Sequence, residues 1–305
     1  MDISYLITIF NKENEIQETI YSIKNQQKID SLNIEIVCID DLSDDNSIHI
    51  LENLQKKDPR IKVIKNDKNL GPSRSLNLAA KHAKGKYLIP IDGDDFLPVD
   101  ATRYLLDNAK KYNSELVFGM SKRLFTIPET VTYVSVEDFH DRPLEFVLKN
   151  PIVRMGYLVS KNLWMLAGGA DEKVFIQDMS LPLRLAANAK SLVYLNSVIY
   201  YLRKTSDTNL SNNTDQQHHD RYITYLNFLN SYEKELSKFK LDSFVHSKMI
   251  SSIWKIKRDN YKFPIFSNNF VLYVANKVFK YKLNKKQIIK WLKFFENIEN
   301  IRRIN

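Results

Sequence analysis

The stretch KYLIPIDGDDFLP, residues 86–98, has three carboxylates directly after a short apolar run. Tyr87 to Ile91 is short, apolar and preceded by a Gly-Lys turn, which is typical of a buried strand. Asp92, Asp94 and Asp95 are therefore expected where a strand ends. Adjacent acids repel one another unless a cation neutralises them, and Mg²⁺ and Mn²⁺ prefer oxygen ligands of this kind. The stretch predicts a divalent metal site, with a solvated turn as the alternative.

The chain around this stretch predicts an α/β fold with a mainly parallel sheet. Short apolar runs indicate strands that alternate with segments of helical spacing, a pattern typical of βαβ units. Ligands of such sheets bind beyond the carboxyl ends of the strands. Thr8 to Asn11, Asp40 with Asp41, and the acids of residues 92–95 are therefore expected along one edge. The alternative is that these acids form turns or cap helices.

Local signals give the expected bounds of the other elements. Asn46 and Asp100 are expected to cap helices, and Gly85 to end one. Asp178 is either another N-cap or a general base. Strands are expected at 3–10, 34–39, 61–65, 116–120, 130–136, 157–160, 191–195 and 198–203, and helices at 14–25, 46–57, 72–85, 100–112 and 142–149.

The second part of the chain has a different character. Residues 206–220 are polar and lack apolar periodicity, which indicates a loop or linker. We predict a catalytic domain over 1–204, a linker over 205–220 and a basic, aromatic-rich helical appendage over 221–305. The aromatic residues and lysines of the appendage fit an acidic membrane surface, or aromatics packed in a helical core. These aromatics include Trp254, Tyr261, Phe263, Tyr273, Phe279, Tyr281, Trp291, Phe294 and Phe295.

Composition limits the class of protein. The 305 residues are 44% hydrophobic and carry a formal net charge of +9, which suits an anionic partner. Cys38 is the only cysteine, so no disulfide forms within the chain and a reducing compartment is expected. The N-terminus lacks the features of a signal peptide, and no apolar run reaches the roughly 18 residues of a spanning helix. We expect a cytoplasmic protein, either soluble or peripheral at the inner face of the membrane.

Five motifs occur in an order that resembles the family 2 inverting glycosyltransferases with the GT-A fold. The resemblance covers Ser4 to about Arg203. Its motifs are ITIFNKE at 7–13, IVCIDDLSDDNS at 36–47, NLGPSRSLN at 69–77, IDGDD at 91–95 and QDMSLPLR at 177–184.

The resemblance implies a role for each matching residue. A nucleotide-sugar, with UDP as the expected nucleotide, would be bound by the loops after the strands, and the diphosphate by Mn²⁺ or Mg²⁺ on Asp94 and Asp95. Asp178 would be the catalytic base for a hydroxyl of a glycan or glycolipid acceptor. The implied nucleotide-sugar residues are Thr8, Phe10, Asn11, Glu13, Asp41, Asn69, Gly71, Arg74, Asp92 and Gly93.

Departures from the family pattern concern substrate contacts rather than reaction class. Thr8 stands where proline is common, Phe10 where tyrosine is common, Leu76 where many members have arginine, and Gln177 replaces a glutamate. The Gln-x-x-Arg-Trp motif of processive synthases is absent from the sequence. The expected activity is hexosyl or hexosaminyl transfer in surface polysaccharide or lipopolysaccharide synthesis. The alternatives are a sugar nucleotidyltransferase or a silent glycosyltransferase-like binding protein; a nucleic-acid binder is disfavoured, since no recognisable module occurs.

Overall fold

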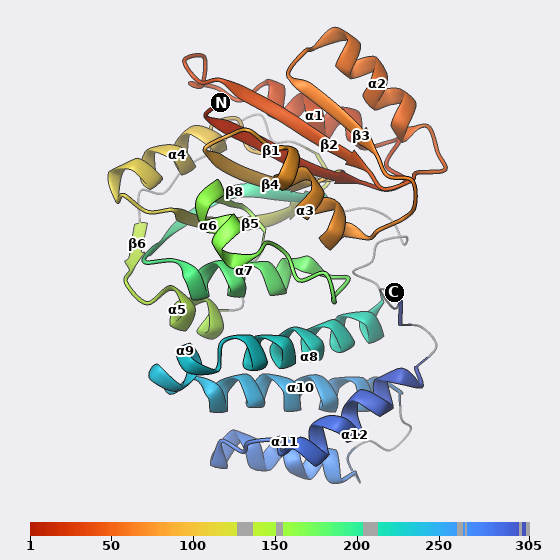
Figure 1. Ribbon diagram of the computed structural model, residues 1–305, viewed down its shortest axis with the longest axis vertical. Coiled ribbons are helices and arrows are strands. Elements are labelled where there is room, and N and C mark those ends of the chain that lie inside the picture. The colour runs from red at the N-terminus through yellow and green to blue at the C-terminus, as the bar shows by residue number, and fades with distance from the viewer. Residues whose placement is uncertain are drawn as a thin grey trace. The chain divides into compact units, whose positions relative to one another are not determined.

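The computed structural model contains a sheet with the strand order β3-β2-β1-β4-β7-β5-β8-β6 (Figure 1). The neighbouring strands among β3, β2, β1 and β4 pair in parallel, and β5 is parallel to β8. In contrast, β7 runs antiparallel to β4 and β5, and β6 runs antiparallel to β8. The predicted mainly parallel α/β sheet is confirmed. Its strands are β1 (Ile3–Ile9), β2 (Ile34–Asp40), β3 (Ile61–Lys65), β4 (Tyr87–Asp92), β5 (Leu116–Leu124), β6 (Glu137–His140), β7 (Tyr157–Ser160) and β8 (Leu192–Arg203).

Helices cover both faces of this sheet. The chain moves along the sheet from β1 to β3 and then returns to β4, and right-handed connections place helices on opposite faces when the direction reverses. Accordingly α1 and α2 lie behind the sheet and α3 in front of it in Figure 1. These helices and those that follow are α1 (Ile16–Lys24), α2 (Ser47–Lys57), α3 (Pro72–His82), α4 (Ala101–Lys111), α5 (Pro143–Lys149), α6 (Lys161–Ala167) and α7 (Gln177–Asn188).

The core of the sheet is built from β1 and β2. Every residue of β2 is buried, including Cys38, the pKa of whose thiol is raised by that burial. Strands buried on both faces read as continuous apolar runs, which is why these two were predicted from the sequence. They place the loops after residues 9 and 40 side by side, because Ile9 is opposite Asp40 in the register.

The structure describes residues 1–126, 137–150, 155–203, 213–260, 265, 267–298 and 301–302. Two compact units divide the chain. Unit 1 is Met1–Ala170 with Arg184–Thr205, and unit 2 is Asp171–Leu183 with Ser206–Asn305. Unit 2 contains the helices α8 (Thr214–Ser231), α9 (Glu233–Lys238), α10 (Asp242–Asn260), α11 (Asn268–Phe279) and α12 (Lys285–Glu296).

Unit 2 differs from the predicted C-terminal appendage in two ways. Asp171–Leu183, predicted within the catalytic domain, groups with the C-terminal helices. Residues 214–220, predicted within a linker, are the first turns of α8. Their polarity has a physical reason, since Gln216 and Asp220 are buried and bonded to other polar groups of unit 2. No helix in the described part of the chain is long and apolar enough to cross a membrane.

The structure corrects two local predictions, those on the last two strands and on Gly85, and does not describe a third. Leu192–Arg203 is one strand, because its register with β5 shifts on both sides of Met120 and a bulge replaces the predicted turn. Gly85 does not cap α3, whose C-cap is Ala83. A Cβ at position 85 would come within 2.5 Å of the nitrogen of Ser4, so glycine permits close approach to β1. The predicted strand at 130–136 lies outside the described residues.

Two predicted helix caps also differ. Asn46 and Asp100 occupy N-cap positions, but neither side chain makes a capping hydrogen bond. Asp100 instead accepts a hydrogen bond from Lys28 at 3.2 Å.

Candidate active site

The acid-rich turn after β4 lies against the end of β1. Thr8 is opposite Asp92 in the parallel register. The N–H of Gly93 donates to the carbonyl of Thr8 at 3.1 Å, and a Cβ at position 93 would lie 2.9 Å from that oxygen. Thr19 of α1 donates its hydroxyl to the carbonyl of Gly93 at 3.1 Å. The turn is thus fixed between β1 and α1, and glycine permits that close approach.

Asp94 pairs with a cation that the sequence analysis did not select. Nζ of Lys12 lies 2.6 Å from Oδ2 of Asp94, with side-chain exposures of 24% and 16%. Burial by itself lowers the pKa of Lys12, but the carboxylate of Asp94 and neighbouring acids outweigh it and raise that pKa. Lys12 is therefore charged at neutral pH and neutralises part of the acid cluster.

Asp95 is turned into the protein interior. Only 4% of it is exposed, and Oδ1 accepts the N–H of Arg203 at 2.8 Å. Burial raises the pKa of Asp95 well above its usual value, and the charges of Asp92 and Asp94 add to the increase. The carboxyl group also hydrogen-bonds the side chain of Tyr200, whose hydroxyl accepts the N–H of Asp92 at 3.0 Å. Asp95 therefore anchors the turn to β8.

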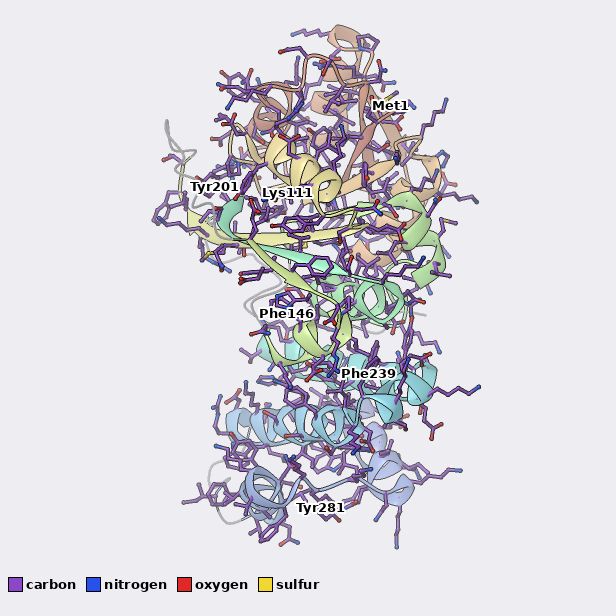
Figure 2. All side chains as sticks on the ribbon, turned by 90° about the vertical axis from the view of Figure 1, so that its left-hand side faces the viewer. Met1, Lys111, Phe146, Tyr201, Phe239 and Tyr281 are labelled. Atoms are coloured by element: carbon purple, nitrogen blue, oxygen red, sulfur yellow. The ribbon has the colours of Figure 1, made fainter. Side chains whose placement is uncertain are left out.

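Arg203 at the end of β8 joins three parts of the site. Its Nε donates to the backbone carbonyl of Asp94 at 2.8 Å, and a terminal nitrogen lies 2.6 Å from a carboxylate oxygen of Glu18. Its Cζ lies 5.1 Å from the centroid of the Phe96 ring. Phe96 exchanges two backbone hydrogen bonds with Tyr201, which Figure 2 labels on β8. The sequence signal for this contact is the arginine that ends the predicted strand at 198–203.

Asp41 begins the loop after β2 and organises the loop before α3. Its Oδ1 accepts hydrogen bonds from Nδ2 of Asn66 at 2.7 Å and from the N–H of Leu70 at 2.8 Å, and its Oδ2 accepts the N–H of Gly71 at 2.8 Å. Asn69 donates to the backbone carbonyl of Asp41 at 3.2 Å. The carboxylate is buried and already accepts three donors, so its predicted contact with the nucleotide-sugar remains a prediction.

The loops after β1 and β2 are tied to each other through predicted site residues. Oδ1 of Asn11 accepts the N–H of Asp44 at 3.0 Å, and Oε2 of Glu13 accepts the N–H of Asn46 at 2.9 Å. Phe10 is 38% exposed at this edge. The structure therefore brings together the ends of β1, β2 and β4, as the sequence predicted.

The sequence pattern described as glycosyl transferase family 2 matches residues 4–150. Residues 4–150 are a family 2 glycosyltransferase domain. The domain includes every predicted nucleotide-sugar and metal residue. Asp178, Tyr200 and Arg203 lie beyond it in the sequence.

Relatives of the family 2 domain are bacterial glycosyltransferases. The poly(ribitol-phosphate) beta-glucosyltransferase of Bacillus spizizenii is 35% identical over 40% of this chain and 19% of its own length. The chain thus spans about a fifth of that relative. The putative glycosyltransferase EpsH of Bacillus subtilis is 25% identical over 93% of this chain and 86% of its own length.

A solved structure supports the fold over almost the entire chain. S. aureus TarS 1-349, crystallised in complex with UDP-GlcNAc, has a TM-score of 0.70 and 18% sequence identity. The similarity covers 97% of this chain and 80% of that one. The fold is therefore the GT-A fold expected from the resemblance.

The donor set of the family 2 domain is compatible with a metal that also binds phosphate. Across the described ranges, no three His, Cys, Asp or Glu side chains form a group that could hold a metal ion by themselves. Mg²⁺ at phosphate sites uses one or two carboxylates, with phosphate and water as the other ligands. Asp94 and the half-buried Asp92 fit this requirement better than Asp95, which is bonded within the interior.

Asp178 follows the family 2 domain in sequence and belongs to unit 2. It lies in the first turn of α7 rather than at the N-cap. The segment before α7 is held by Asp220 of α8, whose Oδ2 accepts the N–H groups of Phe175 at 2.9 Å and Ile176 at 2.8 Å. Asn227 of α8 donates to Asp171 at 2.8 Å. Helix α8 therefore supports the segment that carries the predicted base, a role the sequence did not indicate.

An Asp41→Asn variant should be less stable by about 3 kcal/mol, because an amide nitrogen would face backbone N–H donors that now bond a buried carboxylate. Chemical denaturation measures this change. Asp44→Asn, at an exposed position of the same loop, is the matched control and should change stability by less than about 0.5 kcal/mol. Equal stability of the two variants would contradict the role assigned to Asp41.

Proposed function

We propose that this chain transfers a hexose or N-acetylhexosamine from a UDP-sugar to a hydroxyl group of a glycan or lipid-linked glycan, with inversion at the anomeric carbon. The observation that carries the proposal is the edge formed by the ends of β1, β2 and β4 within a family 2 domain. UDP is proposed because TarS, which shares the fold, was crystallised with UDP-GlcNAc.

The leaving group gains negative charge as the bond from the sugar to the diphosphate breaks. A divalent ion held by Asp94, with Asp92 beside it, would supply electrostatic stabilisation of that charge when bound. Lys12 adds a positive charge at the same place, since its ammonium group lies 2.6 Å from Asp94. Tyr200 and Arg203 hold the turn in position through Asp95 and the backbone of Asp94.

Asp178 is proposed as the general base. Its carboxylate would take the proton of the acceptor hydroxyl as that oxygen attacks the anomeric carbon from the face opposite the diphosphate. One displacement of this kind inverts the configuration. The bonds from Asp220 restrict the backbone just before α7 and so favour a fixed position for Asp178.

The acceptor is proposed from the relatives. One of them is named a poly(ribitol-phosphate) beta-glucosyltransferase. We propose that this chain acts in surface polysaccharide or lipopolysaccharide synthesis, in the cytoplasm and at the inner face of the membrane.

The test is formation of UDP from a panel of UDP-sugars, with Mn²⁺ and a panel of polyol-phosphate and lipid-linked glycan acceptors. We expect acceptor-dependent UDP release and, by NMR of the product, an anomeric configuration opposite to that of the donor. Retention of configuration would refute the inverting mechanism. Pyrophosphate release from a nucleoside triphosphate and a sugar phosphate would instead identify a nucleotidyltransferase.

A further inference from the structure

Helix α11 exposes an apolar face. Val271, Val274 and Val278 are 64%, 45% and 71% exposed, and Phe279 at the end of the helix is 78% exposed. The valines follow the spacing i, i+3 and i+7, which places them on one side of a helix. Transfer of such a face from water into an apolar environment is favourable, so an exposed face of this kind indicates a binding surface.

The opposite side of α11 attaches it to α10. The rings of Phe270 and Tyr273 pack on Trp254, with ring centroids 5.0 and 5.6 Å away. Nδ2 of Asn276 donates to the hydroxyl of Ser247 at 2.7 Å. Within unit 2, Figure 1 shows α10 between α8 and α11. The valines are therefore not needed to hold α11 in place.

Three of the aromatic residues considered for membrane contact from the sequence are buried, whereas Phe279 is exposed at the end of α11. Trp254, Trp291 and Phe295 are 8%, 5% and 2% exposed, so they form the helical core that was the alternative prediction. The structure thus moves the candidate contact surface from these aromatics to the valine face of α11.

The helical pair α11 and α12 is strongly basic. Residues 268–296 include seven lysines and one acid, Glu296. Lys282 pairs with Asp242, and Tyr281 beside it, labelled in Figure 2, accepts a hydrogen bond from Gln287 at 3.2 Å. The remaining lysines of this segment are all exposed: Lys277, Lys280, Lys285, Lys286, Lys290 and Lys293.

We propose that the α11 face, defined by Val271, Val274, Val278 and Phe279, binds the surface of an anionic lipid bilayer. The apolar side chains would enter the boundary between headgroups and acyl chains, and the lysines would contact anionic headgroups. The charge favours lipid over a second copy of the chain, because two such basic surfaces repel each other. Only the biological role of this lipid binding, which is to keep the enzyme near lipid-linked acceptors, rests on the proposed function.

Co-sedimentation of the full chain with lipid vesicles tests the proposal. We expect binding to phosphatidylcholine vesicles that contain phosphatidylglycerol, about tenfold or more stronger than to phosphatidylcholine alone, and weaker in high salt. Combined Val271→Ser, Val274→Ser and Val278→Ser substitutions should lower this binding about tenfold or more, since serine matches valine in helix propensity but is polar.

Met165→Ser with Leu166→Ser is the matched control. These residues are 63% and 69% exposed on α6 of unit 1, and their replacement should leave vesicle binding unchanged. Circular dichroism checks that both variants keep their helices. Wild-type protein that ignores anionic vesicles, or a triple-serine variant that binds like wild type, would overturn the proposal.

Two further outcomes separate the alternatives. A dimer seen by light scattering and lost in the triple-serine variant would assign the α11 face to self-association and overturn lipid binding. UDP release with a detergent-solubilised acceptor should be equal in wild type and the triple-serine variant. If wild type releases no UDP yet binds vesicles, the proposed function fails and the lipid surface stands.

Discussion

Asp94→Asn should lower kcat for sugar transfer about a thousandfold, equivalent to about 4 kcal/mol of transition-state stabilisation. The substitution removes the negative charge proposed to bind the divalent ion and leaves Lys12 without the carboxylate 2.6 Å from its ammonium group. The apparent affinity for Mn²⁺ should fall about tenfold or more. Initial rates measured over a range of Mn²⁺ and UDP-sugar concentrations give both values.

A matched variant separates this effect from a general loss of surface charge. Asp100→Asn removes the partner of Lys28 just before α4 and should change kcat less than about twofold. Lys12→Met should retain the dependence on Mn²⁺ but bind UDP more weakly, because at the proposed site the lysine would contribute charge beside the diphosphate. If Asp94→Asn retained more than a tenth of wild-type kcat, Asp94 would not be the metal ligand.

The shared edge could be predicted because it follows from local patterns and one topological rule. Apolar runs ending in polar residues located the ends of β1, β2 and β4, and parallel strands place those ends together. The register confirms this, with Thr8 opposite Asp92 and Ile9 opposite Asp40. The Asp-Gly-Asp-Asp turn places three carboxylates within four residues, so a metal site could be predicted there without any tertiary information.

The partners of the acids could not be predicted in the same way. The hydroxyl of Tyr200 and the backbone N–H of Arg203 each bond a group of the turn that lies 108 residues away in the chain. Nothing in an apolar strand marks which of its polar groups meets the turn. The strand was predicted in two pieces because the signal of a bulge resembles that of a turn. Lys12 lies inside a quoted motif, yet its role depends on the approach of Asp94.

The support of Asp178 is a second tertiary feature that the sequence concealed. Residues 214–220 were read as a linker because they are polar, but polarity in a buried segment serves hydrogen bonding. Asp220 is 2% exposed and accepts from two backbone N–H groups just before α7, and from Gln216 at 2.8 Å. We infer that α8 positions the segment that carries Asp178, the proposed base.

Asp178→Asn should lower kcat between about a hundredfold and ten-thousandfold while leaving the KM for the UDP-sugar close to that of wild type, since general base catalysis acts on the acceptor proton. It should also remove the acid limb of the pH–rate profile, because activity no longer depends on deprotonation of that carboxylate. Steady-state kinetics across a range of pH measure both effects. Asp215→Asn on α8 is the control and should keep the wild-type profile, since its amide oxygen can still accept the hydrogen bond that Nδ2 of Asn260 donates to Asp215 at 2.7 Å.

Asp220→Asn distinguishes a positioning residue from the base itself. The amide would keep one acceptor oxygen but place an NH₂ group against donors, which shifts the segment before α7 and should lower kcat about tenfold. Because Asp178 is still present, the acid limb of the profile should remain. An Asp178→Asn enzyme that keeps both its rate and its acid limb would exclude Asp178 as the base, whereas loss of the limb in Asp220→Asn alone would assign proton transfer to Asp220.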